Sequence, residues 1–297
     1  MLQRFFVKNT FLFQRYLAWF KNAVELISQF DELVDTYMSK MTLDFEDGIA
    51  FLKFNHPEVM NAVGSEMLGD FQDAVEEIKI SGDRARCVLL TGEGRGFCAG
   101  ANLQDDSKSN KPKEAGSSLR AGYHPLLFEL RGLDMPIVTA VNGAAAGVGM
   151  SFALMGDIIC ASKQAFFLQA FARIGLVPDG GSTFVLPRLI GWGRAVELSM
   201  LAERLPADQA LEWGLINRLY EDNTSLMVGA KEIAHKLARG PKSLSLIRKA
   251  YWNTWQNSYE QQLDLEAQLQ NEAGRTSDFK EGVGAFLEKR DAKFKGQ

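Results

Sequence analysis

The stretch "PIVTAVNGAAAGVGMSFALMGDIICAS" (residues 136–162) contains the pattern that decides the fold. The apolar runs at 136–141 and 157–162 are typical of strands that are covered on both faces. The segment between them is rich in glycine and alanine and leads into a short helix. A strand, a helix and a second strand in this order form a right-handed crossover in a mainly parallel sheet. The stretch therefore predicts an α/β core.

The segments before this stretch fit the same core. The sequence "TLDFEDGIAFLKFN" (42–55) predicts two short strands that turn at Asp47 and Gly48. A helix that Ser65 can cap is expected next. Its apolar face is expected to contain Met67, Leu68, Phe71, Val75 and Ile78. "RCVLLTG" (86–92) is a continuous apolar run and predicts another buried strand.

The rest of the chain divides into further parts. The segment 104–118 is polar and lysine-rich, which is typical of a mobile loop, and we expect it to act as a lid. Beyond about residue 195 the pattern is almost entirely helical. We therefore expect an N-terminal amphipathic helical extension (1–40), an α/β core that holds the active site (41–195), and a helical C-terminal region (196–297). The last region is expected to dock on the core or on a neighbouring subunit.

The N-terminal segment differs in composition from the rest. Its first 24 residues contain four basic side chains and no acidic one, and its apolar residues recur at helical spacing. Gln14 and Arg15 interrupt the apolar run, which argues against a secretory signal and a membrane-spanning helix. Three alternatives stay open: packing on the domain or a partner subunit, a transit-like or membrane-surface helix, and translation from a start upstream of Met38 or Met41. Packing is favoured, so membrane contact of residues 1–30 is the lesser alternative.

The overall composition excludes several classes of protein. Of 297 residues, 46% are hydrophobic and 24% are charged, which is ordinary for a soluble globular protein. The net charge of −4 gives no reason to expect nucleic acid as a partner. Cys87, Cys98 and Cys160 lack CxxC spacing, and the three histidines lack partners at ligand spacing, so neither disulfides nor a metal site is predicted. The simplest expectation is a reducing, cytoplasmic location.

Two glycine-rich turns give the first indication of chemistry. "TGEGRGFCAGANL" (91–103) follows the strand at 86–90, and "NGAAAGVGMSFALMGD" (142–157) follows the strand at 136–141. Glycine permits close approach of the backbone to a ligand, and free N–H groups at a helix start attract negative charge. Two such turns at neighbouring strand ends could point two N–H groups at one oxygen, which is the geometry of an oxyanion hole.

The same two turns are compatible with a purely structural role. Small residues can serve only to let a helix pack closely on a sheet, and this alternative stays open on local pattern alone. A dinucleotide fold is disfavoured, because "GAAAGVG" is not GxGxxG after the first strand, and a P-loop would need GK[ST]. A serine hydrolase would need GxSxG, and Ser151 lacks the closing glycine.

Five segments together resemble the crotonase superfamily, the enoyl-CoA hydratase/isomerase family. They are "RGFCAGANL", "PIVTAVNGAAAGVGMSFALMGDIICAS", "RIGLVPDGGSTFVLPRLIG", "ALEWGLINRL" and "FKEGVGAFLEKRDAKFKG", which follow the family order. The resemblance implies a spiral of ββα units, a helical C-terminal trimerisation region, acyl-CoA thioester substrates, and assembly as a homotrimer or hexamer. No cofactor is expected, since coenzyme A is part of the substrate. The C-terminal half is most similar to the branch of 2-(1,2-epoxy-1,2-dihydrophenyl)acetyl-CoA isomerases.

Carried over residue by residue, the resemblance implies a site. The oxyanion donors are expected to be the backbone N–H groups of Ala99 and Val148. The expected substrate contacts are Gly100, Ala101, Gly147, Phe171 and Lys289. Lys289 matches a C-terminal lysine that reaches CoA phosphates in relatives, sometimes across subunits. Glu58 stands where relatives often have a basic residue, which leaves that phosphate contact without support.

The hydratases of this family use two glutamates to activate water, and this chain has neither. Their places are taken by Ser151 and Phe171. Hydration needs a general acid and base on one water molecule, which these side chains do not supply. The resemblance therefore argues against a standard hydratase.

Asp179, in "GLVPDGGSTF", is the one carboxylate at a family acid/base position. Its place before two glycines and an apolar run suits either a helix cap or a proton carrier. Phe166, Phe167 and Phe171 are expected to desolvate it and raise its pKa. The favoured function is an acyl-CoA isomerase with Asp179 as acid and base. The alternatives are an enoyl-CoA hydratase or lyase that uses another residue, and a catalytically inactive acyl-CoA-binding homologue.

Overall fold

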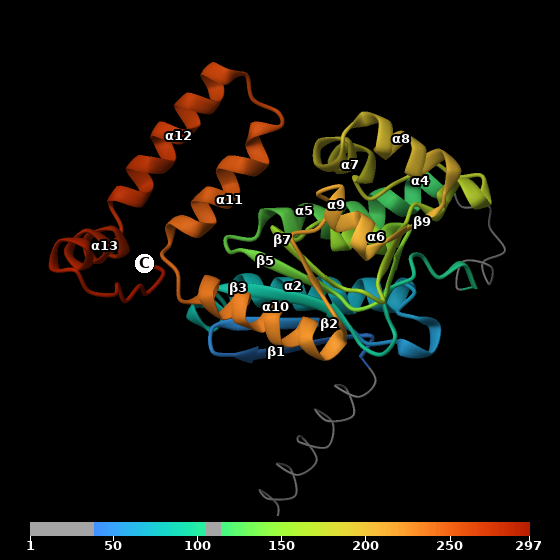
Figure 1. Ribbon diagram of the computed structural model, residues 1–297, viewed down its shortest axis with the longest axis horizontal. Coiled ribbons are helices and arrows are strands. Elements are labelled where there is room, and N and C mark those ends of the chain that lie inside the picture. Colours follow the sequence, from blue (N-terminus) through green and yellow to red (C-terminus); the bar gives the residue numbers. More distant parts are fainter. Residues whose placement is uncertain (1–38, 105–113) are drawn as a thin grey trace, which may run out of the picture. The chain divides into compact units, whose positions relative to one another are not determined.

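A computed structural model of the chain describes residues 39–104 and 114–297 (Figure 1). The predicted N-terminal helix and most of the predicted lid lie outside these residues. Internal contacts separate Met1–Ser39 from a unit of Lys40–Gln297, which holds the described helices and strands. Among the described residues, no helix has the length and apolar character needed to cross a membrane.

A six-stranded sheet forms the centre of this unit. Its strand order is β1–β2–β3–β5–β7–β10, with β1 antiparallel to β2 and every other neighbouring pair parallel. The strands are β1 (Met41–Glu46), β2 (Ile49–Phe54), β3 (Cys87–Gly92), β5 (Ile137–Val141), β7 (Ile158–Ser162) and β10 (Arg218–Tyr220). The predicted hairpin is confirmed, and Asp47 and Gly48 form its turn with φ of 51° and 79°. The predicted strands at 86–92, 136–142 and 157–162 are confirmed as β3, β5 and β7.

A second sheet has four short strands. The chain enters it directly after each of three strands of the first sheet. Its order is β4–β6–β8–β9, formed by Gly96–Cys98, Ala144–Ala146, Phe166–Leu168 and Arg204–Pro206. The chain passes from β3 to β4, from β5 to β6 and from β7 to β8, with helical segments between these pairs. This is the spiral of ββα units that the resemblance implied.

Glycine is required where the chain crosses between the two sheets. A Cβ on Gly143 would lie 2.1 Å from Arg95 O, and a Cβ on Gly92 would lie 2.4 Å from Phe97 O. Backbone there lies directly against backbone, and no side chain fits between. The crossing brings β4 beside β6, so the turns that follow these two strands end at the same place.

The large sheet is covered on both faces, as its continuous apolar runs predicted. Because side chains alternate along a strand, Val88 and Leu90 join one core, while Cys87 and Leu89 join another. Helices α2 (Ser65–Ile80), α5 (His124–Gly132) and α6 (Val148–Ala153) contribute to the first core, and α10 (Asn223–Ala238) closes the second. Figure 1 shows α10 lying over β2 and β3.

The helix predicted near Ser65 is α2, with one correction at its start. Its N-cap is Gly64, without a side-chain hydrogen bond, so Ser65 is the first helical residue and not the cap. The apolar face is otherwise as predicted: Met67, Phe71, Val75 and Ile78 are buried, and Leu68 is half-buried.

The C-terminal part is mainly helical, as predicted, but two short strands interrupt it. The further helices are α7 (Ser182–Ile190), α8 (Trp192–Leu201), α9 (Ala207–Glu212), α11 (Ser243–Thr254), α12 (Tyr259–Gly274) and α13 (Ser277–Glu288). Strands β9 and β10 are three residues each, too short for a period to show in the sequence. Arg248 on α11 is buried and donates to Asp157 Oδ2 at 2.7 Å and to Leu133 O at 3.0 Å, which fixes α11 on the core.

Candidate active site

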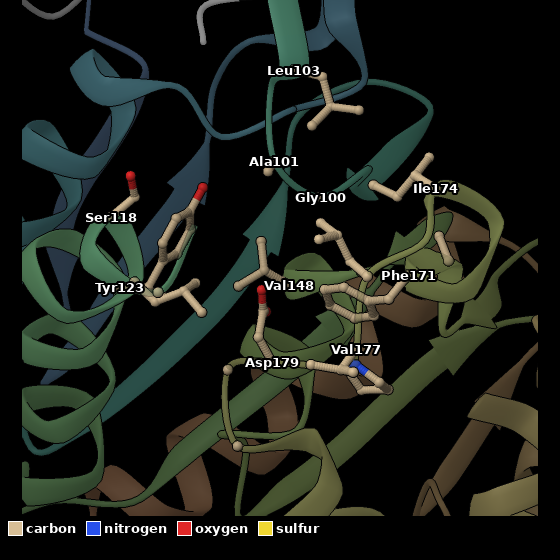
Figure 2. A pocket seen from close by; sticks show the side chains of 18 of the residues that line it. Gly100, Ala101, Leu103, Ser118, Tyr123, Val148, Phe171, Ile174, Val177 and Asp179 are labelled. Carbon is tan, nitrogen blue, oxygen red and sulfur yellow. The ribbon is translucent and has the colours of Figure 1, made fainter. Parts of the chain in front are cut away.

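A cavity of about 830 Å³ lies where the two glycine-rich turns meet the loop that precedes α7 (Figure 2). Its walls come from the turn after β4, the start of α6, the segment 170–181, and the π-helical turn η3 (Leu119–Tyr123) that leads into α5. Apolar side chains make most of the lining: Leu103, Leu119, Val148, Phe171, Ile174, Leu176, Val177 and Pro178. Of the sequence-predicted site residues, the structure brings together Ala99, Gly100, Ala101, Gly147, Val148, Phe171 and Asp179. Lys289 is the C-cap residue that follows α13, is exposed, and does not line this cavity.

The turn after β4 offers a different backbone donor from the predicted one. The N–H of Ala99 donates to Met60 O at 3.0 Å, so it is already engaged within the chain. The N–H of Ala101 has no acceptor among the described residues, and Ala101 is exposed to the cavity. The expectation for Ala99 is therefore corrected: the donor that this turn leaves available is Ala101.

Asn61, which the sequence analysis missed, holds this turn in place. It is fully buried at φ 59°, and its side-chain amide donates to Glu93 O, Gly96 O and Phe97 O at 2.9–3.1 Å. Its Oδ1 accepts the N–H of His56 at 2.8 Å. The one signal in the sequence is the residue type, since asparagine tolerates positive φ better than other side chains.

The second turn offers the N–H of Val148 at the start of α6. Gly147 is the N-cap of α6 at φ 52°, and its own N–H donates to Leu168 O at 2.9 Å. Val148 is the first helical residue, and its N–H has no acceptor among the described residues. The two turns touch, because a Cβ on Gly100 (φ 102°) would lie 2.9 Å from Ala146 O and 3.7 Å from Gly147 Cα. Both free donors thus line one cavity.

Asp179 places its carboxylate in this cavity. Figure 2 shows the side chain pointing towards Val148, with Tyr123 on one side and Phe171 on the other. Oδ1 is buried, and none of the described residues donates a hydrogen bond to it. Burial raises the pKa of Asp179 to about 6, because desolvation penalises the charged form and no charge in the described part of the chain offsets it.

The helix-cap alternative for the Asp179 side chain is wrong. Helix α7 begins at Ser182, its N-cap is Gly181, and no side chain caps it. Asp179 contributes only its carbonyl oxygen, which accepts the N–H of Ser182 at 3.1 Å and the Ser182 hydroxyl at 2.8 Å. The side chain is left without a structural partner in the part of the chain that the structure describes.

The two positions at which the resemblance places hydratase glutamates have different surroundings. Ser151 is buried on α6, and its hydroxyl donates to Asp179 O at 3.0 Å. Phe171 is buried in the cavity wall, and its ring lies 3.8 Å from where a Cβ on Gly147 would stand. Neither position offers a group that can take a proton from water.

The desolvating side chains are only partly the predicted ones. Phe171 lines the cavity as expected, with Val148 and Val177 near it. Phe167 is fully buried in the core, and the Phe166 ring lies 4.4 Å from the Arg204 guanidinium carbon, so neither lines the cavity. The expectation for Phe166 and Phe167 is therefore wrong, since strand alternation and β9 direct these rings elsewhere.

Among residues 39–104 and 114–297, three other ionisable groups line the cavity. They are Tyr123, His124 and Arg173. Arg173 donates to Ala202 O through Nε at 2.9 Å and through an Nη at 2.5 Å, which turns its charge towards the end of α8. Among the described residues, no group of three or more acidic, histidine or cysteine side chains could hold a metal ion.

Both the sequence and the fold are similar to those of known proteins. The sequence model of the family described as enoyl-CoA hydratase/isomerase matches residues 44–297. The chain therefore belongs to the enoyl-CoA hydratase/isomerase family, and its spiral of ββα units is the crotonase fold. It is 42% identical to the 1,2-epoxyphenylacetyl-CoA isomerase of Escherichia coli K12 over 255 residues, which cover 85% of this chain and 97% of that protein.

A second relative and a solved structure carry hydratase names. The chain is 40% identical to a protein of Rhodobacter capsulatus named "Probable enoyl-CoA hydratase", over 88% of this chain and all of that protein. The crystal structure of an enoyl-CoA hydratase from Bacillus anthracis has a TM-score of 0.81 at 30% identity, covering 87% of this chain and 100% of that one. The similarity thus shows the family. Because the relatives include both an isomerase and hydratases, the choice between these two reactions rests on the geometry of the site.

Proposed function

We propose that this protein is an acyl-CoA isomerase in which Asp179 is both the acid and the base. The observation that carries the proposal is the combination, in a single apolar cavity, of a carboxylate whose buried Oδ1 has no partner among the described residues and two backbone N–H groups, those of Ala101 and Val148. At the same time, the two positions expected to hold hydratase glutamates carry Ser151 and Phe171. The Asp179 carboxylate can move a proton on a substrate, and neither Ser151 nor Phe171 supplies the second carboxylate expected of a hydratase.

The proposed reaction follows from what each group can do. The two N–H groups donate to the thioester oxygen, which gains charge when a proton leaves the neighbouring carbon. The carboxylate of Asp179 takes that proton and, as a neutral acid, returns it to another carbon of the same acyl group. A pKa of about 6 lets Asp179 serve in both forms near neutral pH. No electrons leave or enter, so the proposed reaction needs no cofactor beyond the coenzyme A of the substrate.

The relative from Escherichia coli suggests the acyl group to test first. Its name gives 1,2-epoxyphenylacetyl-CoA as what it isomerises, and we propose an acyl group of this aromatic-derived class for the present site. The size of the cavity, about 830 Å³, and its wall of Leu119, Tyr123, Phe171 and Val177 suit a bulky apolar group. An unsaturated aliphatic acyl-CoA is the second substrate to test.

We also propose that the chain assembles as a homotrimer or a hexamer. Large apolar side chains are exposed on α12 and α13: Tyr259, Leu263, Phe279, Val283, Phe286 and Leu287. Exposed apolar groups in this number support a surface that another subunit covers. In such an assembly Lys289 at the end of α13 would reach the CoA phosphates of a neighbouring site. Light scattering at micromolar concentration tests this, and a monomer would count against it.

The second candidate function is an enoyl-CoA hydratase, favoured by the name of the Rhodobacter capsulatus relative. A catalytically inactive acyl-CoA-binding protein is the third. One experiment separates all three. The purified protein is incubated with 1,2-epoxyphenylacetyl-CoA and with a 3-enoyl-CoA that carries deuterium on the carbon next to the thioester, and the products are resolved by chromatography and mass spectrometry.

The isomerase predicts products that differ from the substrate by no atom other than exchanged hydrogen. Part of the deuterium is carried within the molecule to the second carbon, and the fraction that exchanges with solvent lowers the product mass by the difference between deuterium and hydrogen. Partial transfer is expected because one carboxyl group both removes and returns the proton. A gain of one water would support the hydratase and overturn the proposal. Binding without any new product, with all of these esters, would support the inactive homologue.

A further inference from the structure

We infer that Ser151 is a positioning residue, whose hydroxyl ties the backbone of the Asp179 loop to helix α6. Helix α6 is the element that begins at Val148, so the tie sets the distance between the carboxylate and one proposed oxyanion donor. This inference rests on the proposed function, in which Asp179 is the acid and the base. It gives Ser151 a role in the reaction although its side chain touches no substrate.

The hydrogen bonds at one oxygen distinguish Ser151 from its neighbours. Asp179 O accepts the Ser151 hydroxyl at 3.0 Å, the Ser182 hydroxyl at 2.8 Å and the Ser182 N–H at 3.1 Å. Ser182 is only three residues further along the chain, at the start of α7, so its two bonds close a local turn and move with Asp179. The Ser151 bond alone among these three joins the loop to α6, from a residue 28 positions earlier in the chain.

The packing around Gly180 gives a second, independent reason. Gly180 lies at φ 60°, and a Cβ there would stand 2.6 Å from Ser151 Cβ and 3.3 Å from Val148 Cγ2. The backbone of the loop therefore rests directly on α6, with no space for a side chain between them. Ser151 is 1% exposed, which means that its hydroxyl is also sealed from solvent.

The Asp179 side chain depends on this tie because nothing else described in the structure holds it. Its Oδ1 has no donor among the described residues, so the carboxylate is placed by the backbone to which it is attached. No ionisable side chain of α6 faces it, since α6 reads "VGMSFA". The ionisable groups that described residues place on the other walls are Tyr123, His124 and Arg173, and the Arg173 charge is held at Ala202 O. Burial thus controls how Asp179 titrates, and a looser loop would admit water to it.

The test is Ser151→Ala in the full-length protein, assayed with whichever acyl-CoA ester the isomerase assay identifies. We expect kcat to fall about tenfold with little change in KM, because the carboxylate is misplaced while the binding cavity stays intact. We also expect the acidic limb of the pH profile of kcat/KM to move to lower pH, since Asp179 gains solvent. A purely structural role would lower the melting temperature and leave the pH profile unchanged.

The matched control is Thr139→Val. The Thr139 hydroxyl is also fully buried and donates to Ala153 O, at the other end of the same helix, at 2.9 Å. Its loss should lower the melting temperature to a similar degree as Ser151→Ala, without moving the pH profile. If Thr139→Val moves the profile equally, general loosening of α6 explains the effect and the inference is overturned.

A second variant covers the case in which Ser151→Ala does not fold. Ser151→Cys keeps nearly the same size with a weaker donor, so its kcat and pH profile should lie between those of Ser151→Ala and the unchanged protein. Kinetics identical to the unchanged protein, in every Ser151 variant that folds, would overturn the inference and leave the proposed function standing. Full activity of Asp179→Asn would overturn the proposed function itself, whatever the Ser151 variants do.

Discussion

Asp179 and Asp278 are two carboxylates in opposite surroundings. Asp278, at the start of α13, is 3% exposed and accepts the backbone N–H groups of Lys242, Lys295 and Gly296 at 2.7–2.8 Å. Asp179 faces a cavity, and its buried Oδ1 accepts nothing from the described residues. Three backbone donors make one carboxylate a structural tie, whereas the other is left free to exchange a proton. The contrast predicts which substitution affects the reaction and which affects the fold.

The largest effect is expected from Asp179→Asn. The amide has the same shape but cannot take a proton near neutral pH, so isomerase turnover should fall on the order of 10²–10⁴-fold. Stability should not fall, because the lost charge has no hydrogen-bond partner at Oδ1 among the described residues. Steady-state kinetics together with a melting curve measure both. A variant that is active but unstable would reverse the assignment of the two carboxylates.

Asp278→Asn should show the opposite behaviour. The amide nitrogen cannot accept a hydrogen bond, so at least one of the three N–H groups loses its partner in a buried place. We expect the free energy of unfolding to fall on the order of 2–3 kcal/mol. Turnover per folded molecule should stay close to that of the unchanged protein. Chemical denaturation checks the first expectation, and active-site titration with the substrate checks the second.

The pH dependence sharpens the contrast further. Because the pKa of Asp179 is raised from 3.8 to about 6, activity that needs the carboxylate should rise as the pH passes about 6. The contribution of Asp179 to stability changes in the opposite direction, because it falls as the pH rises. The protonated carboxyl is favoured in the fold below pH 3.8, and this advantage is lost as the pH rises through about 6.

The amide of Asp179→Asn stays neutral at every pH, so this variant does not lose stability as the pH rises through about 6. Near pH 8 it should therefore be more stable than the unchanged protein by on the order of 1 kcal/mol, a value reduced for the partial exposure of the group. The two proteins should converge near pH 4. Melting temperatures measured across this range provide the comparison, and equal stability at every pH would show that Asp179 is not strained by burial.

The smallest effect is expected from deleting residues 1–37. The family match begins at residue 44, and both carboxylates lie within Lys40–Gln297. We expect kcat/KM and solubility to stay near those of the full chain. Loss of soluble protein would show that the N-terminal segment covers an apolar surface, and loss of activity alone would place it at the substrate.

Much of the fold could be predicted because long segments carry a clear period. The strands β3, β5 and β7 are continuous apolar runs, and α8 and α10 repeat apolar residues at helical spacing. The strands of the second sheet have three residues each, which is too few for a pattern, so only the resemblance indicated them.

The site was predicted at the level of its turns but not of its individual donors. The glycines around Ala99 marked the right turn, yet which N–H is free depends on Met60, a distant residue whose carbonyl binds Ala99. The helix-cap alternative for Asp179 was wrong for the same reason. A proline, an aspartate and two glycines suit a cap, and only the three-dimensional path shows that α7 starts later, at Ser182. Local sequence pattern predicts helices, strands and turns, whereas contacts between distant residues determine which donors and acceptors are engaged.

The contact between Gly180 and Ser151 has a consequence for which side chains position 151 can hold. The backbone of the Asp179 loop occupies the space into which a longer side chain at position 151 would extend, since a Cβ on Gly180 would stand 2.6 Å from Ser151 Cβ. Ser151→Glu, which would restore one expected hydratase glutamate, must therefore displace the loop that carries Asp179. Position 151 and the loop are therefore coupled, and a larger side chain at position 151 calls for a different backbone path at Gly180.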